Sequence, residues 1–190
     1  MKKIIALCLI LSLTACGGFD DMDAARLGFT GIGSSNNQPN NSVSRWQYSS
    51  VAEGDRIFSL SATNYSINTY QRPDYTNLQG RPWIKLERDQ SYDGAIDNTV
   101  VIFTDSNVSC MPSCSIRMSF DGNWATYNMR HIIDGVIRPI DEATGSTLFK
   151  KFTTSNRAIV RLPIIGLSEP FDANFNLSGY DIKRMKFTNE

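Results

Sequence analysis

The stretch SIRMSFDGNWATYNM, residues 115–129, decides the fold class. Ile116, Met118 and Phe120 alternate with polar residues, so they share one face of a strand. The Asp-Gly pair at 121–122 then favours a hairpin turn, because Gly tolerates the positive φ that such turns require. The alternation resumes over 124–129, which predicts a second strand antiparallel to the first.

Similar strand patterns lie on both sides of this hairpin. Residues 99–104, TVVIFT, form a nearly continuous apolar run, which indicates a central strand buried on both faces. Leu148, Phe149 and Phe152 have helical spacing and predict a helix over Thr144–Thr153. Further strands are predicted by the runs Arg45–Tyr48, Ile57–Ala62, Trp83–Glu87, Ala158–Leu162 and Phe171–Leu177. We therefore expect a mainly β, antiparallel β-sandwich or barrel-like domain with one short helix.

The order of these features resembles one family of exported proteins. A tryptophan at position 46 is followed by the long β-run, the pair Cys110 and Cys114, and the Asp-Gly turn. From about Trp46 to Lys186 this order is similar to the exported β-sandwich proteins of the invasion-associated locus B type. The resemblance implies a compact β-sandwich and carries over no catalytic residue.

Cys110 and Cys114 are predicted to form a disulfide. An even pair of cysteines at short range in an exported chain favours a structural bridge. The spacing C-x-x-x-C differs from the C-x-x-C of redox motifs, and a single histidine cannot complete a zinc site. We expect the bridge to lock a hairpin end between a strand finishing near Val108 and one starting at Ser115.

The first residues have the pattern of a secretory leader. Two lysines follow Met1, and the apolar run Ile4–Leu13 is about ten residues long, whereas a spanning helix needs ~20. The sequence Leu13-Thr14-Ala15-Cys16 resembles the lipobox of bacterial lipoproteins. This resemblance implies cleavage after Ala15 and attachment of lipid to Cys16. The alternative is an ordinary secretory signal that leaves a soluble periplasmic protein.

The resemblance to lipoproteins also implies a location. Gly17, rather than Asp, follows Cys16, and in Gram-negative lipoproteins this favours the outer membrane over the inner membrane. We expect an outer-membrane protein, lipid-anchored and facing the periplasm.

Three segments are expected: a signal peptide over 1–15, a lipidated tether over 16–42 and one β-rich domain over 43–190. The tether is rich in Gly, Ser, Asn and Asp, a composition that buries too little apolar surface to order itself. A flexible chain of about 25 residues has an r.m.s. span of about 25–30 Å. Such a tether holds the domain away from the lipid headgroups.

Charge and composition restrict the partners. Basic and acidic residues are equal in number, at 19 each, and loss of Lys2 and Lys3 with the leader makes the mature chain slightly acidic. The sequence has no clustered basic segment of the kind that indicates nucleic-acid binding. We therefore expect a membrane contact through the lipid anchor, a protein partner in the cell envelope and no nucleic acid.

The sequence does not assemble a recognisable catalytic set. His131 is the only histidine, so every Ser–His or Cys–His mechanism would have to use it. Carboxylates that a glycosidase would need in pairs are scattered at Glu53, Asp55, Glu87, Asp121, Asp141 and Glu142. We predict that the protein is not an enzyme and has no cofactor, with a carboxylate-dependent hydrolase as the alternative.

The segment Asp89–Val100 resembles a calcium-binding EF-hand loop in part. Asp89, Ser91, Asp93 and Asp97 occupy ligand positions, but Val100 stands where a bidentate Glu belongs. The flanking runs also indicate strands rather than helices. Two interpretations stay open, a weak calcium loop and a polar connection between strands, and the sequence favours the connection.

The segment Asn64–Pro82 is the best candidate for a binding loop. It is long and polar, and its aromatic and arginine residues are of the types that dominate protein interfaces: Tyr65, Tyr70, Arg72, Tyr75 and Arg81, with Trp83 just beyond. The expected function is protein binding in a structural, accessory or assembly role in the envelope. The alternative within this class is an inhibitor or immunity protein directed against a toxin or cell-wall hydrolase.

The lipobox prediction is tested by Cys16→Ser. The variant is expected to lose incorporation of labelled palmitate and to leave the membrane fraction, because the acceptor thiol is gone. Cys8→Ser is the matched control, since Cys8 lies in the expected leader and its loss leaves the acceptor intact. Wild-type labelling of Cys16→Ser would contradict the prediction.

Overall fold

A computed structural model of the chain describes residues 46–75 and 77–187. The expected signal peptide (1–15), Cys16 and the expected tether (16–42) lie outside the described residues. Within the described part, no helix is long and apolar enough to cross a membrane.

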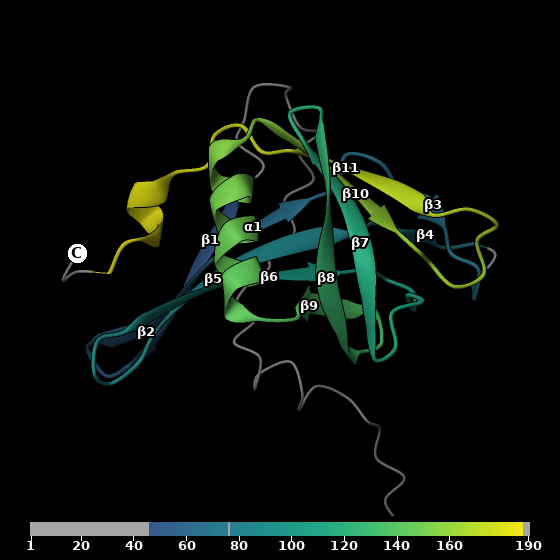
Figure 1. The fold of residues 1–190 in the computed structure, drawn as a ribbon. Coiled ribbons are helices and arrows are strands. Elements are labelled where there is room, and N and C mark those ends of the chain that lie inside the picture. The colour runs from purple at the N-terminus through teal and green to yellow at the C-terminus, as the bar shows by residue number, and fades with distance from the viewer. Residues whose placement is uncertain (1–45, 76, 188–190) are drawn as a thin grey trace, which may run out of the picture. The chain divides into compact units, whose positions relative to one another are not determined.

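The described residues form one large antiparallel sheet, one two-stranded sheet and one α-helix (Figure 1). The strands of the large sheet are β1 (Gln47–Glu53), β2 (Arg56–Tyr65), β5 (Trp83–Gln90), β6 (Ile96–Phe103), β7 (Ser113–Phe120), β8 (Asn123–Ile133), β9 (Val136–Pro139), β10 (Arg157–Leu162) and β11 (Phe171–Asn176). Their order is β1-β2-β5-β6-β9-β8-β7-β10-β11. The small sheet pairs β3 (Tyr70–Gln71) with β4 (Gln79–Gly80). The expected mainly β, antiparallel fold is confirmed.

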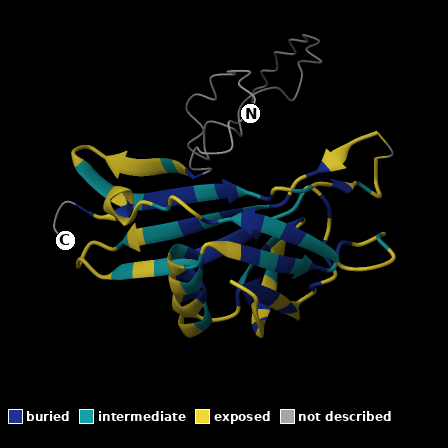
Figure 2. Cartoon of the chain, turned by 90° about the horizontal axis from the view of Figure 1, so that it is seen from above, coloured by how far each residue is buried: buried dark blue, intermediate teal, exposed yellow. Residues whose placement is uncertain are grey.

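The hairpin predicted over residues 115–129 is present as β7 and β8. Phe120 pairs with Asn123, and the turn between them has positive φ at both Asp121 (48°) and Gly122 (91°). Ile116 and Met118, on the apolar face of β7, are 1% and 0% exposed. The alternation of the sequence therefore selects the face that is buried (Figure 2).

Strand β6 is buried on both faces, as its continuous apolar run predicts. Val100 and Ile102 point into the core and are fully buried, and Val101 on the opposite face is only 4% exposed. β6 pairs with β5 on one side and β9 on the other, so it has no free edge where the three strands overlap.

The helix α1 (Glu142–Thr154) lies against the core side of the sheet (Figure 1). Asp141 caps it, because its carboxylate accepts a hydrogen bond from the Thr144 backbone N–H at 2.7 Å. Leu148 and Phe152 are fully buried, and the Phe152 ring meets Phe120 edge to face at 4.9 Å. The helix thus fills the concave side that the curved sheet creates.

The two ends of the large sheet meet. The Trp46 indole N–H, just before β1, donates to the Leu177 carbonyl at 2.9 Å, just after β11. The Asn64 amide donates to the Asn176 carbonyl at 2.9 Å, and the Ile67 backbone N–H donates to the β11 backbone. The sheet therefore closes without a continuous ladder between its edge strands, which is the barrel-like form of the expected fold.

Asn68 completes this closure with its side chain. Its amide N–H donates to the Asp172 carbonyl at 2.8 Å, and its amide oxygen accepts from the Asn174 backbone N–H at 2.9 Å. The side chain thereby imitates a strand residue along the outer edge of β11.

Cys110 and Cys114 have their Sγ atoms 2.01 Å apart, the distance of a disulfide. The position that the sequence indicates for the pair is wrong in one respect. The preceding strand ends at Phe103, and β6 and β7 do not pair with each other, so the bridge does not close a hairpin. It instead constrains the start of β7 after a connection between strands that are apart in the sheet.

The closure predicts a marked effect of Asn68→Ala. The variant leaves the Asn174 backbone N–H without its partner and removes one of the two side-chain amides that donate to the Asp172 carbonyl, so the free energy of unfolding should fall by about 1–3 kcal/mol. Thr69→Ala is the control, because Thr69 is exposed and bonds only the Gln79 side chain among the contacts found, and it should change stability by about 0.5 kcal/mol or less. Equilibrium urea unfolding measures both, and equal midpoints for the two variants would contradict the role of Asn68.

Candidate binding surface

Three aromatic side chains lie side by side on the outer face of the large sheet. Tyr65 pairs with Trp83, and Trp83 pairs with Phe103, across β2, β5 and β6. The Trp83 and Phe103 rings are stacked, with centroids 3.6 Å apart and planes at 4°, and the Tyr65 ring lies 6.0 Å from Trp83. Their neighbours Ile84 and Ile102 are fully buried, so strand alternation places the rings outside. We call Tyr65, Trp83 and Phe103 the aromatic row.

Aliphatic side chains extend the aromatic row across the next two strands. Val136 of β9 pairs with Phe103, and Ile133 of β8 pairs with Val136. The Ile133 side chain is 64% exposed. A contiguous apolar strip of this kind on a polar outer face is typical of an interaction surface.

Arg81 adds a positive charge beside the aromatic row. Its guanidinium lies 5.6 Å from the Tyr65 ring and donates to the Ser66 carbonyl at 2.8 Å. Its backbone N–H donates to the Asp105 carboxylate at 2.7 Å. These contacts hold an arginine in place next to half-buried aromatic rings on the outer face, a combination that is enriched where partners bind.

A band of charged residues runs along one side of the aromatic row. The Glu87 carboxylate accepts from Lys85 at 2.9 Å and from Arg138 at 2.7 Å. The Glu87 side chain is 17% exposed, and both of its oxygens are paired. Glu87, a candidate catalytic carboxylate by sequence, therefore lies in an ion-pair network that forms a polar rim.

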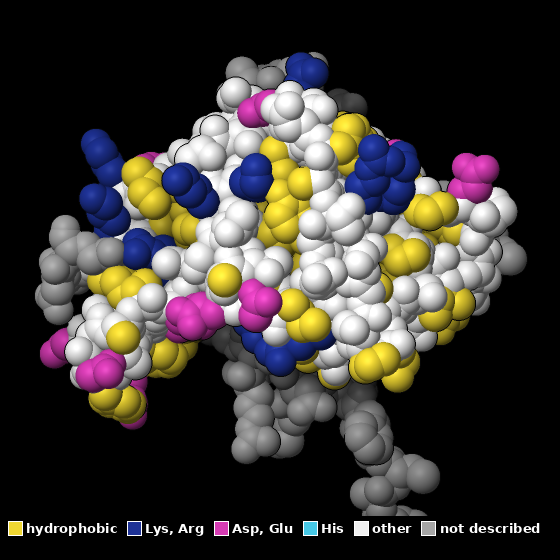
Figure 3. Space-filling model, viewed as in Figure 1, with side chains coloured by type: hydrophobic (Ala, Val, Ile, Leu, Met, Phe, Trp, Pro, Cys, Tyr) yellow, Lys and Arg dark blue, Asp and Glu magenta, His cyan; other side chains and the backbone are white. Residues whose placement is uncertain are grey.

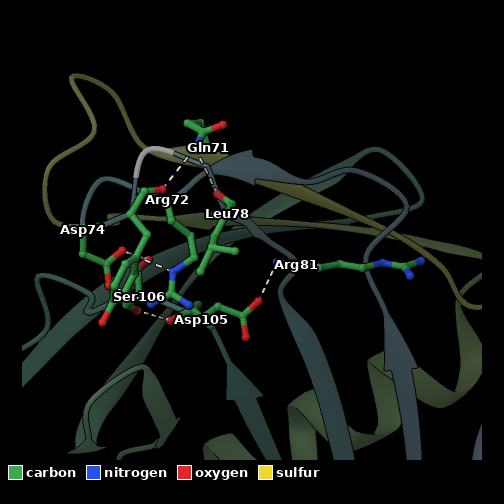
Figure 4. A network of polar contacts seen from close by, with 9 residues as sticks. Gln71, Arg72, Asp74, Leu78, Arg81, Asp105 and Ser106 are labelled. Carbon is green, nitrogen blue, oxygen red and sulfur yellow. Dashed lines mark hydrogen bonds and ion pairs between the residues drawn. The ribbon is translucent and has the colours of Figure 1, made fainter.

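The β3–β4 hairpin carries a second aromatic and arginine pair. Figure 4 shows Arg72 beside Asp74 in this hairpin. The Arg72 guanidinium lies 4.8 Å from the Tyr75 ring and donates twice to the Asp74 carboxylate, at 3.2 and 2.7 Å. The hydrogen bonds from Arg72 hold the pKa of Asp74 below its ordinary value. Tyr75 and Leu78 are 56% and 49% exposed, so the hairpin offers apolar groups at its tip.

An acidic hollow of about 560 Å³ adjoins this hairpin. Asp74, Asp105 and Asp134 line it together with Arg72. Because Arg72 pairs with Asp74, the carboxylates of Asp105 and Asp134 leave the hollow with excess negative charge. Figure 4 shows Asp105 close to this pair, while the Arg81 side chain extends away. The hollow suits a positively charged side chain of a partner.

The structure divides the aromatic and arginine residues predicted to form one binding loop. Tyr65, Arg81 and Trp83 come together in one group, and Arg72 and Tyr75 form another.

Tyr70 belongs to neither group, and its expected place in an exposed patch is wrong. It is 5% exposed and packs against Phe171 at 5.1 Å, and burial raises the pKa of its hydroxyl. A Cβ at Gly80 would lie 2.3 Å from the Tyr70 ring, so glycine is required for this ring to pass beneath β4.

Two more candidate carboxylates have structural contacts. Asp141 caps α1, and the carboxylate of Asp121 accepts from the backbone N–H groups of Asn156 and Arg157 at 2.9–3.2 Å. His131 lies on β8, and its backbone N–H donates to the Pro112 carbonyl. None of these contacts joins His131 to Asp121 or Asp141.

The segment with a partial EF-hand pattern is a hairpin between two strands, as the connection interpretation expects. Asp89 lies near the end of β5 and pairs with Asp97 of β6, so two strands rather than two helices flank the turn. Ser91 donates to Asp93, and Asp93 accepts from the Ala95 backbone N–H, which are contacts within a turn.

The positively charged side chains on one face of the molecule lie apart from one another. Figure 3 shows Lys and Arg in several separate places on that face rather than in one field.

Phe103, Val136 and Ile133 were not predicted as part of a binding surface. Phe103 was placed only within a buried strand, although strict alternation from the buried Val100 and Ile102 turns it outward. An aromatic residue at the outward position of a strand end is the signal that could have identified it. Val136 carries no comparable signal, because its strand is only four residues long.

Comparisons of the chain with protein-family models, with curated proteins and with solved structures find no match. The surface is therefore interpreted from its own chemistry.

The Arg72–Asp74 pair predicts a specific titration. Because the folded pKa of Asp74 is lowered, its contribution to stability is present above about pH 4 and is lost as pH falls through the lowered value. In Arg72→Met the pKa of Asp74 should rise toward about 3.9, measured by carboxyl ¹³C NMR. Asp172 is the internal control, because Arg161 lowers its pKa instead. An unchanged Asp74 midpoint in the variant would refute the assignment.

Proposed function

We propose that the chain is a lipid-anchored binding protein of the bacterial envelope that holds a protein partner on the aromatic row and does not act by turnover. The observation that carries this proposal is the apolar strip from Tyr65 to Ile133 on the outer face of the sheet, which is half-buried along its length and exposed at Ile133. Burial of such a strip against a partner removes apolar surface from water. The neighbouring ion pairs provide a polar rim of the kind found around interface centres.

The chemistry around the aromatic row defines the partner more closely. The row and Arg81 suit an apolar or aromatic partner surface, and the acidic hollow beside Asp105 suits a basic residue next to it. We therefore propose a protein partner that presents a basic side chain beside apolar groups.

The proposed location depends on the leader. The lipobox ending at Cys16, followed by Gly17, supports an outer-membrane anchor on the periplasmic side, with a tether to residue 42 that lets the domain reach its partner. We also propose that the domain is related to the exported β-sandwich proteins of the invasion-associated locus B type, on the order of sequence features from Trp46 to Lys186.

One observation favours an inhibitor or immunity protein as the second candidate. The tip of the β3–β4 hairpin exposes Tyr75 and Leu78, and Arg72 is held beside Tyr75. A short loop of this kind fits the cleft of a toxin or cell-wall hydrolase. In that case Tyr75→Ala would release inhibition of the captured partner, whereas Trp83→Ala would have the smaller effect.

Site-specific crosslinking tests the main proposal. A photoreactive residue at Ile133 in the full chain, expressed in the native bacterium, is expected to trap one protein species. The same residue at Tyr92, which is 86% exposed beyond the opposite end of β5, is the matched control and should not trap it.

A second variant ties the crosslink to the aromatic row. Trp83→Ala should reduce the Ile133 crosslink about tenfold or more, and Trp83→Phe should retain most of it, because a ring is kept. Thermal unfolding shows whether the variants stay folded. Equal trapping at Ile133 and Tyr92, or trapping that ignores Trp83, would overturn the proposal.

A further inference from the structure

A groove separate from the aromatic row lies over β7, β8, β10 and β11. Its volume is about 910 Å³, within the range of roughly 300–1,000 Å³ found for small-ligand sites. Trp124, Ser119, Ile159 and Asn174 are successive register partners and form one row across its floor. Ser119 is small and only 2% exposed, so the floor is low between the Trp124 ring and the far wall at Ile67.

The Trp124 ring is held by two arginines. The guanidinium groups of Arg117 and Arg161 lie 4.9 and 5.2 Å from the ring, and Arg161 is itself fixed by two hydrogen bonds of 2.7 Å to Asp172. Trp124 lines the groove, whereas neither Arg117 nor Arg161 does. The arginines therefore support the ring from outside the groove. Trp124 is 39% exposed, so its ring is pre-organised to contact a ligand.

Planar polar groups surround the rest of the groove. Asn174 and Asn176 lie along β11, and Arg157 pairs with Asn176 at the end of the groove next to the Asp-Gly turn. Among the described residues, the Arg157 guanidinium makes no hydrogen bond or ion pair, and the Asn174 amide oxygen accepts none. Amide and guanidinium groups of this kind bind hydroxyl and carboxylate groups.

The single carboxylate in the groove is already occupied. Asp121 accepts hydrogen bonds from the backbone N–H groups of Asn156 and Arg157, so it braces the turn to β10. Hydrolysis of a glycosidic bond commonly uses two carboxyl groups facing each other. The groove thus has the groups for holding a ligand and not for cleaving one.

The edge of the sheet argues against an extended peptide as the ligand. A peptide that adds to a sheet needs a free strand edge. The outer edge of β11 is taken by Ile67, Asn64 and Asn68, which bond its backbone at Asn174, Asn176 and Asp172. Ala158 and Phe175 of the lining are buried, so the apolar side chains that the groove presents are those of Trp124, Ile67 and Ile159. One indole with two small aliphatic groups suits the flat C–H face of a sugar ring better than a series of side chains.

We propose that this groove binds an oligosaccharide that carries a carboxylated sugar. One sugar ring lies on the indole of Trp124, its hydroxyl groups bond the amides of Asn174 and Asn176, and its carboxylate pairs with Arg157. This site is independent of the aromatic row, so the protein would bind a glycan and a protein partner on different strands.

Binding of defined oligosaccharides tests the proposal. The probes are a tetrasaccharide of galacturonic acid, which is carboxylated, and chitotetraose, which is neutral. The full chain is purified in a detergent without a sugar headgroup, because a glycoside detergent would compete for the groove. Tryptophan fluorescence and calorimetry are expected to show saturable binding at micromolar to millimolar concentrations, tighter for the acidic probe.

Three variants separate the contributions. Trp124→Ala should weaken both probes about tenfold or more, and Trp124→Phe should restore part of the affinity because a ring returns. Arg157→Gln should weaken the acidic probe and leave the neutral probe unchanged. Trp83→Ala should leave the affinity for both probes unchanged, because Trp83 lies in the aromatic row and not in the groove. The glycan proposal can therefore hold or fail independently of the proposed protein partner.

Two results of the binding experiments would contradict the glycan proposal, and a third would assign the groove another ligand. Absence of saturable binding of the acidic probe at millimolar concentration would overturn the proposal, as would acidic-probe affinity that ignores Arg157. An unstructured peptide that binds in competition with the probes and depends on Trp124 would reassign the groove to peptides.

Discussion

An open antiparallel sheet has two edge strands whose outward backbone groups lack partners, and in this sheet one of them, β11, finds partners in residues at the end of β2 and just after it. Residues directly after β2 run beside β11, and Asn68 bonds the backbone of β11 through both atoms of its amide. The Trp46 indole joins the start of β1 to the end of β11. Exposed strand edges invite pairing with other chains, and the closure covers such an edge at β11.

The same closure separates an inner face from an outer one. Inside, the apolar positions of the strands and the buried side of α1 form one core. Outside, side chains that lie far apart in the sequence become neighbours only through the register of paired strands. Tyr65, Trp83 and Phe103 meet in this way, and so do Trp124 and Asn174. The candidate surfaces are thus products of topology rather than of any local motif.

Local features of the fold could be predicted from the sequence. The alternation in residues 115–129 identified both strands and the buried face, and the Asp-Gly pair identified the turn, because each depends on neighbouring residues alone. Strand β9 could not be identified, since Val136–Pro139 is short and ends in proline. The place of the Cys110–Cys114 bridge was misjudged because the strands before and after it, β6 and β7, each pair with two other strands and not with each other.

The candidate binding surface was predictable only in part, because it depends on strand pairing between segments that are distant in the sequence. Composition drew attention to the segment 64–82, and Tyr65, Arg81 and Trp83 do gather there. Tyr70 has the same residue type as Tyr65, but its ring packs against Gly80 and lies in the core. Trp124 carried no signal beyond strand alternation, because its importance depends on Arg117 and Arg161, one of which comes from a strand formed much later in the chain.

Trp46 has a mechanical consequence for a domain held at its N-terminal side. A hairpin pulled from one end opens one hydrogen bond at a time. The β1–β2 hairpin would open in this way if nothing before β1 were attached to the rest of the domain. The Trp46 ring is instead buried against Tyr180 at 5.2 Å and bonded to Leu177, which is 131 residues away in sequence. A force applied to the chain before Trp46 would therefore act first on this contact between distant segments. Only afterwards would it act on the hydrogen bonds between β1 and β2.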